Sequence, residues 1–240
     1  MTPLVFVHGF MGGSAQWALQ QDTLAASREL IAVDLPGFGE NRDLPVINTI
    51  KGFADWVIAK LDAKGIGTFN LMGHSMGGMI AQQIAHQVPD RIEKLVLYGT
   101  GPNGLLPGRF ETIEQSKIRA QQDGVRKTAR RISATWFVDS TIAPEYPACA
   151  AIAEQSAAKA LAAGLDAMRD WSGMEFLKTV ASETLVIWGD SDRTYQWSQP
   201  ELLWRHIPNA HLAVVPGCAH AVHLEKPQIF NMLVEDFLRT

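Results

Sequence analysis

The sequence lacks several features that mark other classes of protein. It contains only two cysteines, Cys149 and Cys218, which have neither a metal-ligand spacing nor a disulfide framework. We therefore expect reduced thiols and a cytoplasmic location, because disulfides persist mainly in oxidising compartments. No apolar run approaches the ~20 residues that span a bilayer, and the opening MTPLVFVHGF has no basic segment typical of a signal peptide. We expect no membrane partner. The formal net charge of −4 also argues against a nucleic-acid partner.

What the chain does have is a regular alternation of two patterns. Short apolar segments that favour buried strands lie at residues 3–7, 28–34, 68–73, 94–99, 184–189 and 211–216. Helical patterns lie near 14–26, 50–64, 77–87, 198–206 and 227–239. Nearly continuous apolar strands indicate a sheet that is covered on both faces. The alternation predicts an α/β fold with a doubly wound, mostly parallel sheet.

One interval, residues 101–180, breaks this alternation. It contains no strand pattern, and its segments 110–137 and 147–165 are rich in alanine and other helix formers. We predict a helical lid inserted between the fourth and fifth strands, above the sheet edge where open α/β sheets bind ligands. The predicted division is therefore an α/β core, 1–100 with 181–240, and a lid between these two parts.

The segment GHSMG, residues 73–77, fits the pattern G-x-S-x-G. It follows a predicted strand and precedes a predicted helix, which is the setting of a nucleophile elbow. Gly73 and Gly77 suit such a turn, because larger side chains would collide across it. The N-terminus of the following helix would direct free N–H groups at a developing negative charge. We therefore predict that Ser75 is a catalytic nucleophile.

A serine hydroxyl needs a neighbouring base, and the base needs an orienting carboxylate. After this type of elbow the acid is expected next, followed by the histidine. The fifth predicted strand is followed by Asp190 and Asp192, and the sixth by His220 and His223. Parallel strands place their carboxyl ends along one edge, so these distant residues can meet. Spacing alone does not choose within either pair.

Five motifs, HGFMGG, DLPGFG, GHSMGG, WGDSD and AHAVHLEKP, occur in the order found in the α/β-hydrolase superfamily. The sequence resembles that superfamily over nearly its whole length, although we expect the family's usual leading hairpin to be absent. The resemblance implies that Asp192 is the acid and His220 the base, with Asp190 and His223 as the alternatives. It implies a catalytic triad that needs no metal and no other cofactor.

The resemblance also implies an oxyanion hole, which requires two donors that are in place before charge develops. Similar enzymes use the backbone N–H of the residue after the nucleophile, here Met76. They use a second N–H from the residue after His-Gly in the first strand-to-helix loop, here Phe10.

Substrate-binding residues are predicted in two places. His74, beside the nucleophile, is expected to line the pocket. The lid offers Trp136, Phe137 and Trp171, which either line an apolar acyl pocket or pack within the lid.

Residues 109–131 carry an excess of positive charge. Seven basic residues stand against three acidic ones: Arg109, Lys117, Arg119, Arg126, Lys127, Arg130 and Arg131 against Glu111, Glu114 and Asp123. Arg126 and Arg130 share a helix face and are predicted to bind substrate. Such a face could steer an acidic acyl carrier protein or a carboxylate-bearing substrate. The alternative is a solvated face with local ion pairs.

The reaction that the resemblance implies is acyl transfer to water. We predict a serine carboxylesterase acting on a small or medium acyl substrate. Lactone opening as in enol-lactonases, methyl-ester removal from an acyl-carrier-protein substrate, and hydrolysis of carbon–carbon bonds in ring-cleavage products remain open. A non-catalytic binding protein of the same fold is less favoured, because Ser75, Asp192 and His220 are all present. A lyase or synthase that uses the same triad is a further minor alternative, which elimination without uptake of water would identify.

Overall fold

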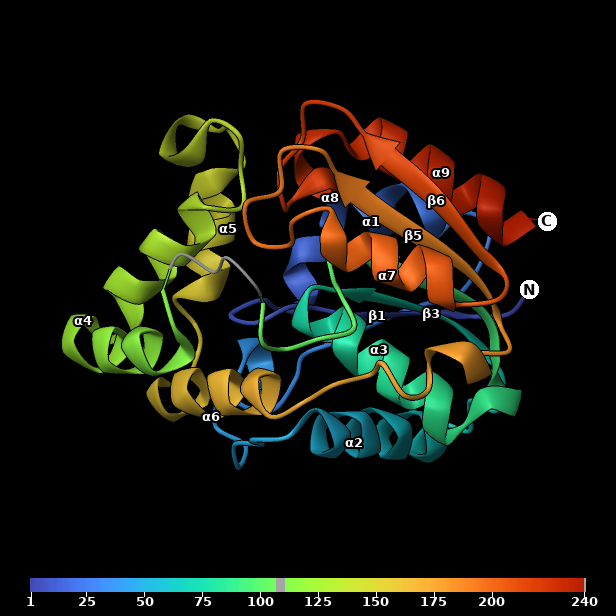
Figure 1. Ribbon diagram of the computed structural model, residues 1–240, viewed down its shortest axis with the longest axis horizontal. Helices are drawn as coiled ribbons and strands as arrows, with labels where there is room; N and C mark the ends of the chain where they lie inside the picture. Colours follow the sequence, from blue (N-terminus) through green and yellow to red (C-terminus); the bar gives the residue numbers. More distant parts are fainter. Residues whose placement is uncertain (107–110, 240) are drawn as a thin grey trace.

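A parallel six-stranded sheet forms the centre of the computed structural model, which describes residues 1–106 and 111–239 (Figure 1). Its strands are β1 Leu4–Val7, β2 Leu30–Val33, β3 Phe69–His74, β4 Ile92–Tyr98, β5 Glu183–Gly189 and β6 Ala210–Val215. The strand order is β2-β1-β3-β4-β5-β6, and every neighbouring pair is parallel. This confirms the predicted fold class and each of the six predicted strands.

Helices cover both faces of the sheet, as the apolar strands required. Helices α2 Ile50–Ala63, α3 Met76–Gln87 and α7 Ser198–His206 pack on one face, and α1 Ala18–Leu24 and α9 Pro227–Arg239 pack on the other. Strand β1 shows the reason, because its side chains alternate between the two cores. Val5 and Val7 join the core beneath α2 and α3, whereas Leu4 and Phe6 join the core beneath α1 and α9.

The segment between β4 and β5 is helical and stands beside the sheet (Figure 1). It contains α4 Ile113–Ala134, α5 Tyr146–Ala153 and α6 Ala158–Arg169. The position of the predicted lid is thereby confirmed, but its helices are more broken than expected. Gly124 interrupts α4 with a φ of 71°, and the predicted helix 147–165 is divided between α5 and α6.

The remaining elements are short. They are α8 Val222–Glu225 and the 3₁₀ turns η1 Ser14–Trp17, η2 Gly39–Asn41, η3 Pro89–Arg91, η4 Ser140–Ile142 and η5 Leu177–Thr179. Among the described residues, no helix has the length and apolar character needed to cross a bilayer. Because all strands are parallel, the loops that follow β1, β3, β5 and β6 meet along one edge, and each carries a predicted site residue.

Candidate active site

Ser75 alone separates strand β3 from helix α3. Its backbone has φ 56° and ψ −120°, a conformation that residues other than glycine rarely adopt. Its N–H donates to the Tyr98 carbonyl oxygen on β4 at 3.0 Å, which holds the turn against the sheet. The strained turn brings a serine side chain to the cavity above the sheet edge, as a nucleophile elbow does.

The glycines around Ser75 have a steric explanation. A Cβ atom on Gly73 would lie 2.2 Å from the Gly77 carbonyl oxygen, and one on Gly77 would lie 2.2 Å from the Val7 carbonyl oxygen. Both contacts are with backbone, which cannot move aside. The glycine spacing of the motif therefore lets α3 start tightly against β1 and β3.

Asp192 and His220 form a buried pair. The Nδ1 atom of His220 lies 2.8 Å from Asp192 Oδ2, and the two side chains are 1% exposed for the histidine and 0% for the aspartate. The other oxygen, Oδ1, accepts the backbone N–H groups of Thr194 at 2.7 Å and Tyr195 at 3.0 Å. A carboxylate in this position holds the hydrogen on Nδ1, which leaves the Nε2 lone pair of His220 free to accept a proton.

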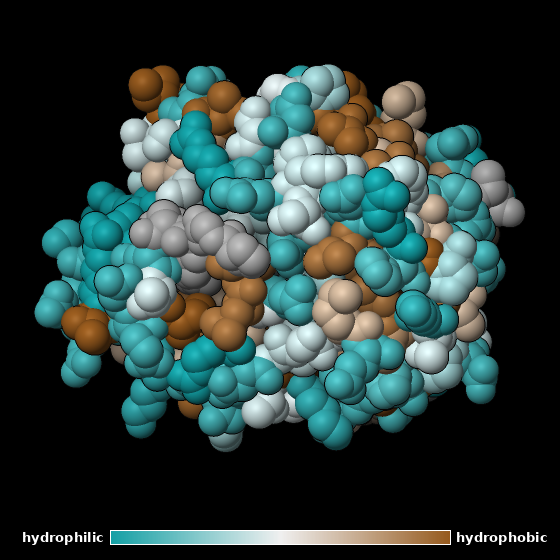
Figure 2. All heavy atoms as spheres, viewed as in Figure 1, coloured by the Kyte–Doolittle hydropathy of each residue, from teal (hydrophilic) through white to brown (hydrophobic). Residues whose placement is uncertain are grey.

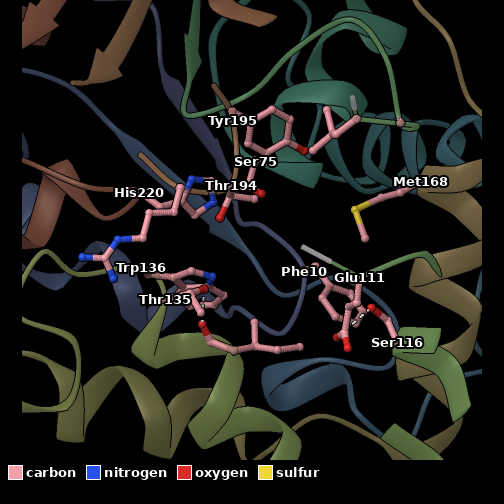
Figure 3. A pocket seen from close by; sticks show the side chains of 14 residues that line it. Phe10, Ser75, Glu111, Ser116, Thr135, Trp136, Met168, Thr194, Tyr195 and His220 are labelled. Carbon is pink, nitrogen blue, oxygen red and sulfur yellow. Dashed lines mark hydrogen bonds between the residues drawn. The ribbon is translucent and has the colours of Figure 1, made fainter. Parts of the chain in front are cut away.

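Ser75 and His220 line the same cavity (Figure 3). In the two described stretches of chain, no hydrogen bond joins the Ser75 hydroxyl to the His220 ring. Such bonds are often long without substrate and tighten when it binds. The arrangement therefore brings the three predicted triad residues to one place.

The loop after β1 is fixed by a buried histidine. His8 Nε2 accepts the backbone N–H of Leu35 at 2.9 Å, so its hydrogen is on Nδ1, which donates to the Gly9 carbonyl at 2.8 Å. Burial lowers the pKa of His8, which keeps the ring neutral. This loop holds Phe10 at the cavity wall.

Asp34, in the DLPGFG motif, fastens the same loop. Its carboxylate accepts the Ser14 backbone N–H at 2.7 Å and the Ser14 hydroxyl at 2.8 Å. The two backbone N–H groups predicted to form the oxyanion hole have no acceptor among the described residues. Met76 is the first residue of α3, so its N–H has no partner in the helix. The Phe10 N–H donates to no acceptor within the described residues.

The cavity has a mostly apolar lining with a few polar groups. Its volume is about 740 Å³, part of it open to solvent. The lining residues are Phe10, Ser75, Gly104, Leu106, Glu111, Ser116, Ile132, Thr135, Trp136, Met168, Arg193, Thr194, Tyr195 and His220. Ser75 and His220 lie toward one end in Figure 3, and Glu111 and Ser116 lie toward the other. One wall comes from the sheet loops and the other from the lid.

His74 and three aromatic residues of the lid were predicted to line the pocket, and of these Trp136 lies in the cavity lining. The structure corrects the expectation for the other three. His74 lies beneath His220, with Nε2 3.1 Å from the His220 carbonyl oxygen. Phe137 packs in a separate apolar cluster of the lid, and Trp171 turns into the core, where its Nε1 donates to Gln83 at 3.1 Å.

Sequence reasoning missed several lining residues. Thr194 and Tyr195 directly follow the acid, so their proximity to Asp192 was a usable signal. Ser116 and Thr135 are polar residues of the lid, and their sequence neighbours gave no sign that they face a cavity.

Six basic residues between 117 and 131 form local ion pairs and share their carboxylate partners. The ion pairs are Lys117 with Asp166, Arg119 with Glu111 and Asp123, Lys127 with Asp123, Arg131 with Glu111 and Asp123, and Arg126 and Arg130 with Glu154. Figure 2 shows mostly hydrophilic residues over this side of the lid. Arg126 and Arg130 are 74% and 53% exposed and lie outside the cavity lining, which corrects their expected place in the pocket. Arg109 lies outside the described residues.

The alternative acid and base lie elsewhere. Asp190 is exposed, and its Oδ1 accepts the Gly217 N–H at 2.7 Å, which fastens the loop after β6. His223 is buried behind the pair, with Nδ1 2.9 Å from the Tyr98 hydroxyl. Within 1–106 and 111–239, no group of three histidine, cysteine or acidic side chains is arranged to hold a metal ion.

Residues 4–232 match the model of the alpha/beta hydrolase family. The chain is 29% identical over 248 residues to the dihydrolipoyllysine-residue acetyltransferase component of the acetoin cleaving system of Pseudomonas putida, and the match covers 99% of this chain but 64% of that protein. It is 29% identical over 253 residues to a 2-hydroxy-6-oxononadienedioate/2-hydroxy-6-oxononatrienedioate hydrolase of Burkholderia vietnamiensis, covering 98% of this chain and 86% of that one. Among solved structures, a thermophilic esterase from Thermogutta terrifontis with malate bound superposes with a TM-score of 0.89 and 25% identity, covering 100% and 90%.

Proposed function

The chain belongs to the alpha/beta hydrolase family, and we propose that it is a serine hydrolase that cleaves carboxylic esters of small or medium acyl groups. The observation that carries this proposal is the meeting of three groups at one cavity. Ser75 stands on a strained turn, His220 lines the same cavity and is paired with the buried Asp192, and no described residue hydrogen-bonds to His220 Nε2.

The proposed reaction begins with proton transfer. His220 Nε2 accepts the hydroxyl proton of Ser75 as Oγ attacks the ester carbonyl carbon. The carbonyl oxygen becomes an oxyanion, which the backbone N–H groups of Phe10 and Met76 stabilise. Asp192 stabilises the charged ring through the hydrogen bond to Nδ1.

The second half returns the enzyme to its starting state. The tetrahedral intermediate collapses, and His220 gives its proton to the departing alcohol. Water then attacks the acyl-enzyme carbonyl while His220 again accepts a proton, and that proton returns to Ser75 as the carboxylic acid leaves. The net reaction consumes one water and produces one acid and one alcohol.

The apolar lining of the cavity supports an acyl substrate. Phe10, Leu106, Ile132, Trp136 and Met168 provide apolar walls for an acyl chain. An acidic carrier protein is less favoured, because the six cations of the described part of 109–131 are engaged in local ion pairs. A lactone remains compatible with the same chemistry, because it is a cyclic ester.

A second candidate is hydrolysis of a carbon–carbon bond in a ring-cleavage product. The 29% identity to the dienedioate hydrolase of Burkholderia vietnamiensis favours it. The two candidates differ in product, since ester cleavage releases an alcohol and carbon–carbon cleavage does not. Assaying a 2-hydroxy-6-oxo-dienoate beside a simple ester would rank them by kcat/KM.

The central test uses p-nitrophenyl esters of graded acyl length. We expect the wild type to turn over and Ser75→Ala to lose at least about 10³-fold in kcat. Ser191→Ala is the matched control, because the Ser191 hydroxyl donates to the exposed Asp190. Equal rates in wild type and Ser75→Ala would reject the proposal, and a loss in Ser191→Ala would show that serine removal acts through folding.

A further inference from the structure

The carbonyl oxygen of His220 receives two hydrogen bonds from buried side chains. The Tyr98 hydroxyl lies 2.6 Å away and His74 Nε2 lies 3.1 Å away. Tyr98, His74 and His220 are each at most 1% exposed. A carbonyl oxygen has two lone pairs, so this oxygen has no further acceptor capacity. The proposed triad does not use these contacts.

The hydrogens in this group can be assigned. A carbonyl oxygen cannot donate, so Tyr98 donates its only proton to His220 and His74 donates through Nε2. The Tyr98 oxygen must then accept from His223 Nδ1, which lies 2.9 Å away. Burial lowers the pKa of His74, and it lowers the pKa of His223 to about 3, so each ring carries one hydrogen.

The same two residues also hold the nucleophile. The Tyr98 carbonyl accepts the Ser75 N–H at 3.0 Å, and His74 is the residue that precedes Ser75. His74 and Tyr98 pair in register across β3 and β4, and their rings stack with centroids 4.5 Å apart. The neighbouring Thr100 hydroxyl donates to the Ser75 carbonyl at 2.8 Å. One end of β4 therefore contacts the backbone of both the nucleophile and the base.

This contact matters because His220 lies in a loop between β6 and α8, whereas Ser75 is fixed by its elbow. A displacement of about 1 Å at a reacting group can cost about 100-fold in rate. We propose that Tyr98 and His74 are positioning residues that set the distance between Ser75 Oγ and His220 Nε2 by holding the His220 carbonyl. The inference rests on the proposed function.

The test removes single hydrogen bonds. Tyr98→Phe deletes only the hydroxyl, and we expect kcat to fall about tenfold with KM within about twofold. His223→Leu is the matched control, because it removes the ring that donates to that hydroxyl but leaves the bond to His220 and the backbone N–H of residue 223 at 3.4 Å. Its kcat should stay within about twofold.

His74 provides an independent test with a conservative variant. His74→Leu has no donor, and its kcat should fall about tenfold. His74→Gln keeps an amide donor and should recover most of that loss. Titration with a fluorophosphonate to its end point counts the competent sites, so that kcat is reported per folded enzyme.

The outcomes separate the inference from the proposed function. Wild-type kcat in Tyr98→Phe would overturn the inference, as would an equal loss in His223→Leu or a loss confined to KM. Equal losses in His74→Gln and His74→Leu would also overturn it. Activity that survives in Ser75→Ala would instead reject the proposed function, whatever the other variants do.

Discussion

The two walls of the cavity around Ser75 are built from different kinds of interaction. The sheet wall is held by buried hydrogen bonds, such as His220 to Asp192 at 2.8 Å and Tyr98 to the His220 carbonyl at 2.6 Å. The lid wall mixes apolar side chains, such as Ile132 and Met168, with polar ones, such as Ser116, and its helices α4 and α6 are joined by ion pairs. Lys117 with Asp166 joins those two helices at 2.8 Å.

The difference bears on what each wall can do. Buried, saturated hydrogen bonds fix positions to fractions of an ångström, which acyl transfer requires. Exposed ion pairs contribute little, about 0–1 kcal/mol each, and weaken with salt. We therefore expect the sheet wall to determine whether the chain catalyses, and the lid wall to determine which acyl group it accepts.

The largest effect is expected from Asp192→Asn. The side-chain oxygen of the introduced asparagine can still accept from Thr194 and Tyr195, which turns its NH₂ group toward His220. His220 Nδ1 must then accept, so the hydrogen moves to Nε2 and the base is lost. Loss of about 10⁴-fold in kcat is typical of this change in serine proteases. Steady-state kinetics beside Asp190→Asn, which should stay within about threefold, would measure it.

An effect on stability is expected from acid. The pKa of His223 falls from 6.5 to about 3 in the folded protein, because the ring is buried. Below pH 6.5 the His223 ring binds a proton in the unfolded chain but not in the folded chain, so the free energy of unfolding falls as pH drops toward 3. At pH 5 this amounts to about 2 kcal/mol.

Urea unfolding at pH 7.5 and pH 5 would check this value. His223→Leu should lose less stability between the two pH values than the wild type does. An unchanged pH dependence in the variant would show that the acid sensitivity comes from other groups.

The contrast between the walls also explains what sequence could predict. The glycines around Ser75 act through collisions with nearby backbone, so the motif alone specifies the turn. The strands could be predicted for a similar reason, because each is recognised by a short apolar run of its own residues. The choice of Asp192 over Asp190 as the acid required the family resemblance. The two carboxylates differ in their contacts, which are with the loop after β6 for Asp190 and with the backbone N–H groups of Thr194 and Tyr195 for Asp192.

The lid shows why the rest could not be predicted. The partner of Arg126 and Arg130 could not be identified, because charges were compared only within 109–131, whereas Glu154 follows α5. Trp171 and Phe137 were recognised as aromatics of the lid, but which side of a helix or loop faces the cavity depends on packing between distant segments.

A change in selectivity is expected from Met168→Ala. Met168 lines the cavity from α6, so its truncation lengthens the space for an acyl chain. The ratio of kcat/KM for longer to shorter p-nitrophenyl esters should rise about tenfold, as one or two methylenes in a pocket allow. Met174 lies outside the cavity lining and provides the matched control, Met174→Ala. A fall in rate for all chain lengths alike would show that the lid wall acts on catalysis itself.

The smallest effect is expected from Glu154→Gln, which releases Arg126 and Arg130 from their shared carboxylate. Because both pairs are exposed, the free energy of unfolding should change by less than about 1 kcal/mol. The kcat/KM for neutral esters should stay within about twofold, since neither arginine reaches the cavity. An ester that carries a carboxylate gives the sharper measurement. If its kcat/KM also stays unchanged at low salt, the lid cations serve only to join helices. If it rises in Glu154→Gln and the rise disappears in salt, the freed arginines attract anions, and the lid wall then also influences how fast substrate arrives.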